Sequence, residues 1–126
     1  NSLQMFHTAE PYLVKAIELD PDLSNAQNNL NYCRSANQLL DDPSFLLNAS
    51  LNAYYTQEYD ECIWYSEKSI ALDANNAIAY NNICSAYNAL QLYLKAEKAC
   101  IKSLELDPNL ELAKNNLNYS RNQLNQ

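Results

Sequence analysis

The stretch that decides the fold is Ala77–Leu110, which reads AIAYNNICSAYNALQLYLKAEKACIKSLELDPNL. Small and apolar residues recur in it at the three- and four-residue spacing that lines one face of an α-helix. The pattern stops at Asp107-Pro108, because proline disfavours the helical conformation of the residue before it. The stretch is therefore predicted to form two helices, over 77–90 and 93–106.

The second of these helices has two further copies along the chain. The segments 6–20, 59–73 and 93–107 each begin with an aromatic residue and end in Leu-Asp. A small residue, a lysine and an aliphatic residue stand at matching places between these ends. The last two copies are 34 residues apart, and each follows another helical pattern, over 44–56 and 77–90. This self-similarity predicts a repeated two-helix unit.

A 34-residue helix–turn–helix unit resembles the tetratricopeptide repeat (TPR). The best match is Ala77–Leu110, whose residues agree in size with the family pattern at repeat positions 4, 7, 8, 11, 20, 27 and 32: Tyr80, Ile83, Cys84, Tyr87, Ala96, Ser103 and Pro108. Cys100 departs from the pattern, since position 24 is usually aromatic. Pro43–Asn76 is a weaker copy. The resemblance implies an all-α fold, an antiparallel solenoid of about seven helices in which small residues let paired helices approach closely.

The two ends of the chain are also related to each other. Residues 1–39 align without gaps on residues 88–126, at an offset of 87, with 18 identical positions. The offset equals two 34-residue units plus one further helix of 19 residues, placed at about 23–40. That extra helix is similar to the solvating helix that ends TPR arrays, where a terminal repeat needs a polar outer face.

The predicted domain organisation follows from this 87-residue offset and the extra helix. Residues 1–40 would hold the second helix of a truncated TPR and a lone capping-type helix, with a boundary at Asp41-Asp42-Pro43. Residues 43–126 would hold two TPR units, 43–76 and 77–110, and a C-terminal capping helix. The helix over 6–19 would then have a partly uncovered apolar stripe. Three covers stay open: further repeats in a longer protein, a fold-back within the chain, or the C-terminal helix (110–124) of another copy, which would stack copies head to tail.

The resemblance also implies a binding surface, because TPR domains use the concave face of the solenoid. The residues expected to line this groove and bind a partner are Asn48, Leu51, Tyr55, Asn81, Asn82, Ser85, Asn88, Asn115, Asn116 and Tyr119. The wider set of concave positions includes Tyr54 and Leu112. Asparagine amides carry donors and acceptors, so such a groove could hold a peptide by its backbone. Chaperone-binding TPRs use a basic clamp, whereas these positions carry Asn, Leu or Ile, which argues against a chaperone C-terminus as ligand.

Three functions are weighed for the chain, one of which, the regulatory appendage of a larger enzyme, would need sequence beyond these residues. The favoured one is a non-catalytic scaffold for protein or peptide partners, which would place the chain in the cytoplasm. The alternative is a self-assembling, head-to-tail subunit of an extracellular fibre with an 87-residue period. Two N-x-S sequons, at Asn48 and Asn118, would fit N-glycosylation in such a fibre. With 19 asparagines in the chain, chance also accounts for both sequons.

Other conspicuous residues have plain structural interpretations. Trp64 and Tyr65 are expected to pack between repeats or to anchor a neighbouring chain. His7 is expected on the surface, and the acidic residues at 58, 60 and 61 should complement a helix N-terminus. The four cysteines, Cys33, Cys62, Cys84 and Cys100, are interpreted as small half-buried residues. Their even number allows three disulfide pairings and selects none.

Composition narrows the classes of function. The chain has 126 residues, a net charge of -7 and no glycine. The absence of glycine excludes the glycine-rich loops that cradle phosphates, and the acidity argues against nucleic acid or anionic membrane as partners. No apolar run approaches the length of a membrane span. No nucleophile–base pair or metal-ligand set is apparent, so no enzyme activity, metal or cofactor is expected.

Overall fold

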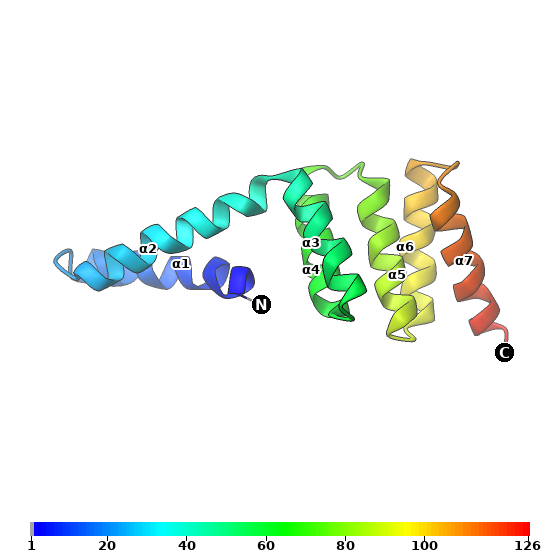
Figure 1. The fold of residues 1–126 in the computed structure, drawn as a ribbon, viewed down its shortest axis with the longest axis horizontal. Helices are drawn as coiled ribbons and strands as arrows, with labels where there is room; N and C mark the ends of the chain where they lie inside the picture. The colour runs from blue at the N-terminus through cyan, green and yellow to red at the C-terminus, as the bar shows by residue number, and fades with distance from the viewer. Residues whose placement is uncertain (1) are drawn as a thin grey trace. The chain divides into compact units, whose positions relative to one another are not determined.

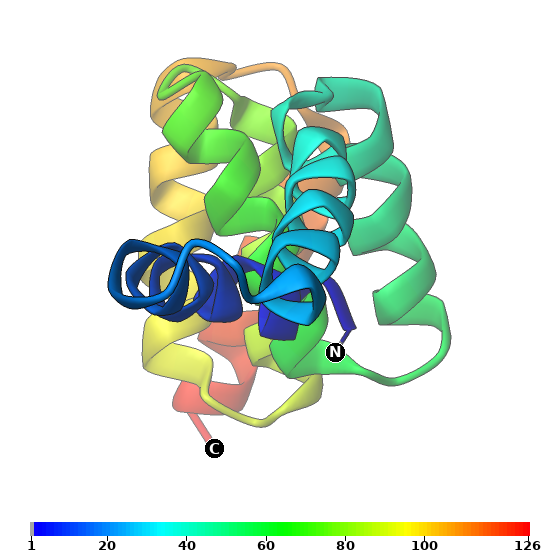
Figure 2. The same ribbon diagram turned by 90° about the vertical axis from the view of Figure 1, so that its left-hand side faces the viewer.

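The computed structural model describes residues 2–126, and every regular element in that range is helical (Figures 1 and 2). The elements are α1 (Ser2–Leu19), α2 (Ser24–Asn37), the 3-10 helix η1 (Gln38–Asp41), α3 (Pro43–Tyr55), α4 (Tyr59–Leu72), α5 (Ala77–Ala89), α6 (Tyr93–Leu106) and α7 (Glu111–Leu124). The predicted all-α fold with seven α-helices is confirmed. Among residues 2–126, none of the helices has the length and hydropathy that spanning a bilayer requires.

The chain divides into two compact units, a first unit that ends at Asp42 and a second unit over Pro43–Gln126. The first contains α1, α2 and η1, and the second contains α3 to α7. Whether α1 belongs to a truncated repeat, and whether α2 and α7 act as caps, stay predictions.

In the second unit, antiparallel helix pairs stand side by side (Figure 1). Helix α3 pairs with α4 and α5 pairs with α6, while α7 packs on both α5 and α6. Small residues lie where the helices meet. Cys84 and Ala96 are fully buried together with Cys100, and Leu117 of α7 closes this cluster. The sequence expectation that position 8 and position 20 of a repeat meet at a helix crossing holds for Cys84 and Ala96.

One sharp turn separates the two helices in each repeat of the second unit. Gln57 and Gln91 adopt the left-handed conformation, with φ of 64° and 61°. The next residue then bonds back to the preceding helix, as in Leu92 N–H to the carbonyl of Tyr87 at 2.9 Å. Glycine tolerates this conformation best. Because the chain has no glycine, glutamine occupies both turns.

The first unit is a helical hairpin of α1 and α2, which we call the N-terminal hairpin. Helices α6 and α7 form a similar hairpin, which we call the C-terminal hairpin. Three internal contacts occur in both hairpins. An arginine–glutamate ion pair joins the helices in each, Arg34–Glu10 at 3.4 Å and Arg121–Glu97 at 3.1 Å. An edge-to-face aromatic pair is also common to both, Phe6–Tyr32 and Tyr93–Tyr119. In each turn an aspartate accepts the amide hydrogen of the residue two positions later, at 3.1 Å. Residues that are 87 positions apart in the sequence thus make equivalent contacts in the two hairpins.

Two helix boundaries differ from the sequence expectation. Helix α1 begins at Ser2 rather than Phe6, so residues 2–5 are helical and not a turn. The equivalent turn at 88–92 is held by bonds to the carbonyls of α5, such as Leu92 N–H to Tyr87. The helix expected over 23–40 ends at Asn37 and continues as η1.

Candidate functional site

The candidate site lies in the second unit, on the face that α3, α5 and α7 share. Helix α5 contacts both α3 and α7, because these are the first helices of successive repeat positions. The 34-residue period places equivalent side chains in a row, so Leu51, Ser85 and Tyr119 occupy the same position on the three helices. A repeated backbone therefore brings residues from distant parts of the chain to one surface.

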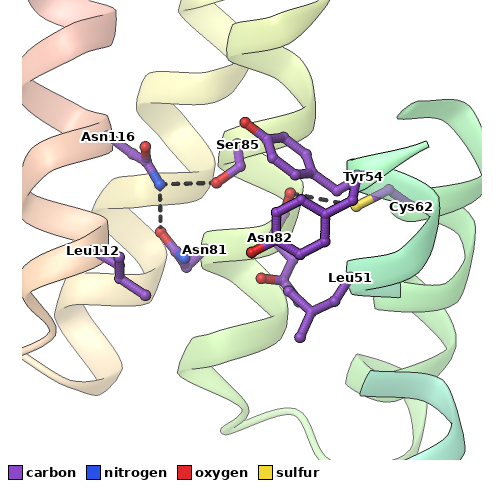
Figure 3. A pocket seen from close by; sticks show the side chains of 9 residues that line it. Leu51, Tyr54, Cys62, Asn81, Asn82, Ser85, Leu112 and Asn116 are labelled. Carbon is purple, nitrogen blue, oxygen red and sulfur yellow. Dashed lines mark hydrogen bonds between the residues drawn. The ribbon is translucent and has the colours of Figure 1, made fainter. Parts of the chain in front are cut away.

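Two adjoining cavities hollow this face. The first has a volume of about 220 Å³ and lies among the side chains shown in Figure 3: Leu51, Tyr54, Tyr55, Cys62, Asn81, Asn82, Ser85, Leu112 and Asn116. The second, of about 250 Å³, is lined by Tyr54, Ser85, Asn88, Ala89, Asn116 and Tyr119. Tyr54, Ser85 and Asn116 line both cavities. We call the two cavities together the concave groove.

A hydrogen-bonded network of amides and hydroxyls joins α5 to α7 along this groove. The amide of Asn116 donates to the side-chain oxygens of Asn81, at 2.9 Å, and Ser85, at 2.8 Å (Figure 3). One turn further along, the amide of Asn88 donates to the carbonyl of Asn116, and its oxygen accepts the hydroxyl of Ser120 at 2.7 Å. Buried polar groups need such partners, so these asparagines hold the helices together.

A similar contact joins α5 to α3. The amide of Asn82 donates to the hydroxyl of Ser50 at 3.0 Å, and the carbonyl of Asn82 accepts a long contact of 3.8 Å from the thiol of Cys62. Asn82 and Asn116 occupy the same repeat position but bind different partners. The position equivalent to Ser50 in the next repeat is Cys84, whose sulfur is bonded to Cys100.

Three of the predicted groove residues line the cavities and also join helices to one another. Asn81, Asn82 and Asn88 are only 4%, 6% and 8% exposed, and their amides are engaged in the contacts between helices. They shape the floor of the groove. Asn48 and Asn115 are exposed but line neither cavity. Ser85 and Asn116 are half-buried and line both.

The accessible rim of the groove is aromatic and aliphatic. Tyr55 is 76% exposed, Leu112 61% and Tyr119 48%. Tyr54 lies against Tyr55 and Tyr59 with edge-to-face ring contacts. Burial and these neighbouring hydroxyls raise the pKa of Tyr54 above its ordinary value, so the ring stays neutral at physiological pH.

Charge is missing from the lining of the groove. Neither cavity has a Lys, Arg, His, Asp or Glu among its lining residues. Among residues 2–126, no three His, Cys, Asp or Glu side chains form a group that could hold a metal ion. The groove therefore offers apolar contact, hydroxyls and amides, and no ionic partner for a ligand.

One lining residue was absent from the groove predicted by sequence. Cys62 belongs to α4, behind the front row of helices, yet it reaches the first cavity. Burial raises the pKa of its thiol to about 11. The sequence signal was its small size at repeat position 20, which places it where two helices cross.

The cysteines are more buried than expected, and two of them are bonded. Cys84 of α5 and Cys100 of α6 form a disulfide with a Cα–Cα distance of 5.4 Å, while Cys33 and Cys62 are free and buried. The interpretation of four half-buried thiols was thus wrong. The antiparallel turn brings positions 8 and 24 of the repeat together, and Cys100 replaces the aromatic side chain usual there.

The remaining candidates have structural positions. Tyr65 is 8% exposed and packs edge-to-face on Phe45, while the half-buried Trp64 has the Lys68 amine 5.1 Å from its ring centre. His7 is exposed. Glu58 precedes α4 and two further carboxylates lie in its first turn, as expected.

Both sequon asparagines, Asn48 and Asn118, are exposed but lie within helices α3 and α7. The sequon hydroxyls of Ser50 and Ser120 are 1% and 0% exposed and are hydrogen-bonded. Glycosylation therefore stays a prediction that the folded chain does not favour.

Two sequence comparisons relate parts of this chain to known proteins. Residues 77–110 match the family model described as tetratricopeptide repeat. Sperm-associated antigen 1 of the mouse (Mus musculus) is 38% identical over 71 residues, and the match covers 53% of this chain but only 8% of that relative. The chain thus spans a small part of the curated relative it matches.

Two solved structures share the fold. One is the first TPR of Spaghetti (RPAP3) bound to the HSP90 peptide SRMEEVD, with a TM-score of 0.66, 20% identity and coverage of 98% of this chain and 95% of that chain. The other is the second TPR domain of human RPAP3 with the HSP70 peptide SGPTIEEVD, with a TM-score of 0.63, 17% identity and coverage of 94% and 98%. Residues 77–110 thus match the tetratricopeptide repeat model, and the chain shares the fold of these two TPR domains.

Proposed function

We propose that the second unit is a non-catalytic interaction module whose concave groove binds an uncharged or basic peptide segment of a partner protein. The observation that carries this proposal is the composition of the groove. Exposed aromatic and aliphatic side chains surround two cavities that no charged residue lines. Such accessible apolar side chains are the usual anchors of protein interfaces.

The dimensions of the groove support an extended ligand. Its two cavities share three residues and together run from Leu51 on α3 to Tyr119 on α7. Each cavity is small, at 220 and 250 Å³, so each would accept one or two side chains and not a whole compact ligand. Exposed amides at Asn48 and Asn115 lie outside the cavities, where they could pair with a peptide backbone.

The two RPAP3 structures support peptide binding as a use of this fold, and they also mark a difference. Their peptides both end in the acidic sequence EEVD. An acidic peptide end needs basic partners, since carboxylates bind well where Lys or Arg can pair with them. The lining residues here contain none, and the chain has a net charge of -7. We therefore infer a ligand without a cluster of carboxylates.

A peptide selection would test this proposal. Display of random peptides against the immobilised chain should yield binders depleted in Asp and Glu and rich in apolar residues. Their affinities should change little with salt, because no ion pair is formed. The SRMEEVD peptide should bind at least about tenfold more weakly than the selected peptides, because its desolvated carboxylates would have no partner.

Two matched variants locate the binding surface. Leu112 lies in the groove and Leu94 on α6 outside it, and they are 61% and 63% exposed. Leu112→Ser should weaken the selected peptides by about fivefold or more through lost apolar contact, and Leu94→Ser should leave them unchanged. Equal effects of both variants, or a selection dominated by acidic peptides, would refute the assignment.

The fibre hypothesis has no comparable support. Neither the comparisons nor the described surfaces point to head-to-tail stacking, and the hydroxyls of both sequons are buried. It remains a prediction. Sedimentation velocity over a concentration series would decide it, since a fibre subunit must associate as its concentration rises.

A further inference from the structure

The N-terminal hairpin has an apolar groove of its own, with a volume of about 400 Å³. We call it the helix seat. It is lined mainly by Met5, Phe6, Ala9, Tyr12, Leu13 and Tyr32. Met5, Tyr12 and Tyr32 are 69%, 79% and 65% exposed, and α1 has no buried residue. Large side chains that contact so little of their own unit are unusual on a finished surface.

The equivalent surface of the C-terminal hairpin shows what fills such a seat. Ala9 and Leu13 of the helix seat correspond to Ala96 and Cys100, 87 residues further on. Those two residues are 0% exposed because α5 lies over them, with Cys84 packed in the same cluster. The ion pair, the aromatic pair and the turn that both hairpins share show that the two surfaces have the same underlying geometry.

We propose that the helix seat is the docking site for one further amphipathic helix with the contact chemistry of α5. The internal copy supplies the argument: in the C-terminal hairpin, a helix of this kind occupies the same positions. This inference concerns a different unit from the concave groove and does not depend on the proposed peptide binding.

Differences between the two hairpins define the docking helix more closely. Ser103, whose hydroxyl donates to the carbonyl of Ala77 on α5 at 2.7 Å, is replaced by Ala16. Ser120, the partner of Asn88, is replaced by Cys33. The docking helix should therefore be more apolar than α5 at these two contacts, since a buried amide without a partner is costly.

One polar side chain is kept at the equivalent position. Asn29 lines the seat and corresponds to Asn116, which donates to Asn81 and Ser85 of α5. The docking helix should thus present one acceptor to Asn29. A small side chain at the place of Cys84 would allow close approach to Ala9.

A second copy of this chain fits the seat less well. Its α5 is already engaged, through the disulfide from Cys84 and the amide network to α7. The exposed apolar residues of its α7, Leu112, Tyr119 and Leu124, are large and alternate with the exposed polar residues Asn118, Arg121 and Asn122. Neither helix therefore offers a free face with a small residue at the place of Cys84.

Met5 makes the seat directly observable, because it is the only methionine of the chain. Exposed methionine is oxidised by peroxide to the sulfoxide, and cover slows the reaction. The probe is a synthetic peptide of residues 76–90 with Cys84→Ser, added to the full chain. We expect saturable 1:1 binding and slower Met5 oxidation as the peptide is added, measured by mass spectrometry of the peptide that contains Met5.

Two glutamate variants provide the matched pair. Ala9→Glu places a carboxylate on the seat, and Thr8→Glu places the same charge on the next, exposed residue outside it. Ala9→Glu should weaken binding at least about tenfold, because the docked helix would bury the charge. Thr8→Glu should change binding by less than about twofold, as surface charges do. Equal loss in both variants would overturn the proposal.

A linked helix removes the weakness of a short free peptide, which is only marginally helical alone. Residues 73–87 are fused ahead of residue 1, which restores the joint that connects α5 to α6. Met5 oxidation should slow in this fusion and return to the original rate when Ala9→Glu is added. Unchanged Met5 oxidation with both peptide and fusion would overturn the proposal. Protection of Met5 that rises with the concentration of the unmodified chain would overturn it in favour of a second copy.

Discussion

The N-terminal and C-terminal hairpins have nearly the same contacts between their own two helices. They differ in whether a further helix covers their apolar surface. The pairs Arg34–Glu10 and Arg121–Glu97 occupy equivalent places, and so do the aromatic pairs. Yet Ala96 is fully buried, whereas its counterpart Ala9 lines an open groove. An apolar stripe on a helix thus becomes part of a hydrophobic core only where a neighbouring helix packs on it.

The comparison also separates two kinds of polar residue. Asn116 and Asn29 stand in the same pattern, but α5 converts the amide of Asn116 into a bridge between helices. Asn29 is exposed. The same side chain is a structural element in one hairpin and a surface group in the other, which the following substitutions can measure.

The largest difference should come from a charge at the helix crossing. Ala96→Glu should destabilise the second unit by about 4 kcal/mol or more, because the carboxylate would be buried and oversized between α5 and α6. Ala9→Glu should cost less than about 1 kcal/mol, since its side chain can reach water. Urea unfolding followed by the fluorescence of Trp64, the only tryptophan, reports on the second unit, and circular dichroism reports on the whole chain. Similar losses at both positions would show that the seat is already covered.

The next effect concerns the disulfide, which only the C-terminal hairpin has. Cys84 and Cys100 close a loop with a sequence separation of 16, and Leu13 stands at the place of Cys100 in the other hairpin. Reduction should lower the free energy of unfolding of the second unit by about 3 kcal/mol, because the unfolded chain gains freedom. The Trp64 transition should move to lower urea on addition of dithiothreitol.

A variant with both Cys84→Ala and Cys100→Ala serves as the control for reduction. Its unfolding should not respond to dithiothreitol, because it has no bond to break. If the unfolding of the natural chain is equally insensitive to dithiothreitol, then Cys84 and Cys100 are thiols in solution. The two hairpins would then not differ by a disulfide.

The third effect tests the amide bridge. Asn116→Ala should destabilise the second unit by about 1–2 kcal/mol, since it leaves Asn81 and Ser85 without their shared donor. Asn29→Ala should change the stability by less than about 0.5 kcal/mol, because Asn29 is exposed. The two variants are compared by urea unfolding with the same fluorescence and circular dichroism signals. A large loss from Asn29→Ala would mean that this amide already has a buried partner.

The helices could be predicted from the sequence because their signals are local. Apolar spacing placed α4, α5 and α6 to within a residue or two, and Asp107-Pro108 marked the end of α6. The groove was predicted in outline from the repeat positions. The burial of Asn81, Asn82 and Asn88 could not be predicted, because each amide finds its partner on another helix and the register between helices is a tertiary property. The pairing of Cys84 with Cys100 is missed for the same reason.

The smallest effect concerns the turn between the paired helices. Gln91 has a φ of 61°, whereas its counterpart Gln4 lies inside α1. Gln91→Gly should stabilise the second unit by about 0.5–1 kcal/mol, because glycine relieves the cost of the left-handed conformation by more than it adds in backbone entropy. Gln57→Gly should act in the same direction, since Gln57 has a φ of 64°.

Gln4→Gly should bring no gain, because glycine in a helix only adds freedom to the unfolded chain. Thermal unfolding followed by circular dichroism would rank the three variants. If Gln4→Gly proved stabilising as well, residues 2–5 would form the turn that the sequence first suggested. The N-terminal hairpin would then begin with the same turn that connects α5 to α6 in the second unit. Because α5 is the helix that covers α6, this small stability measurement also tests how a helix could reach the helix seat.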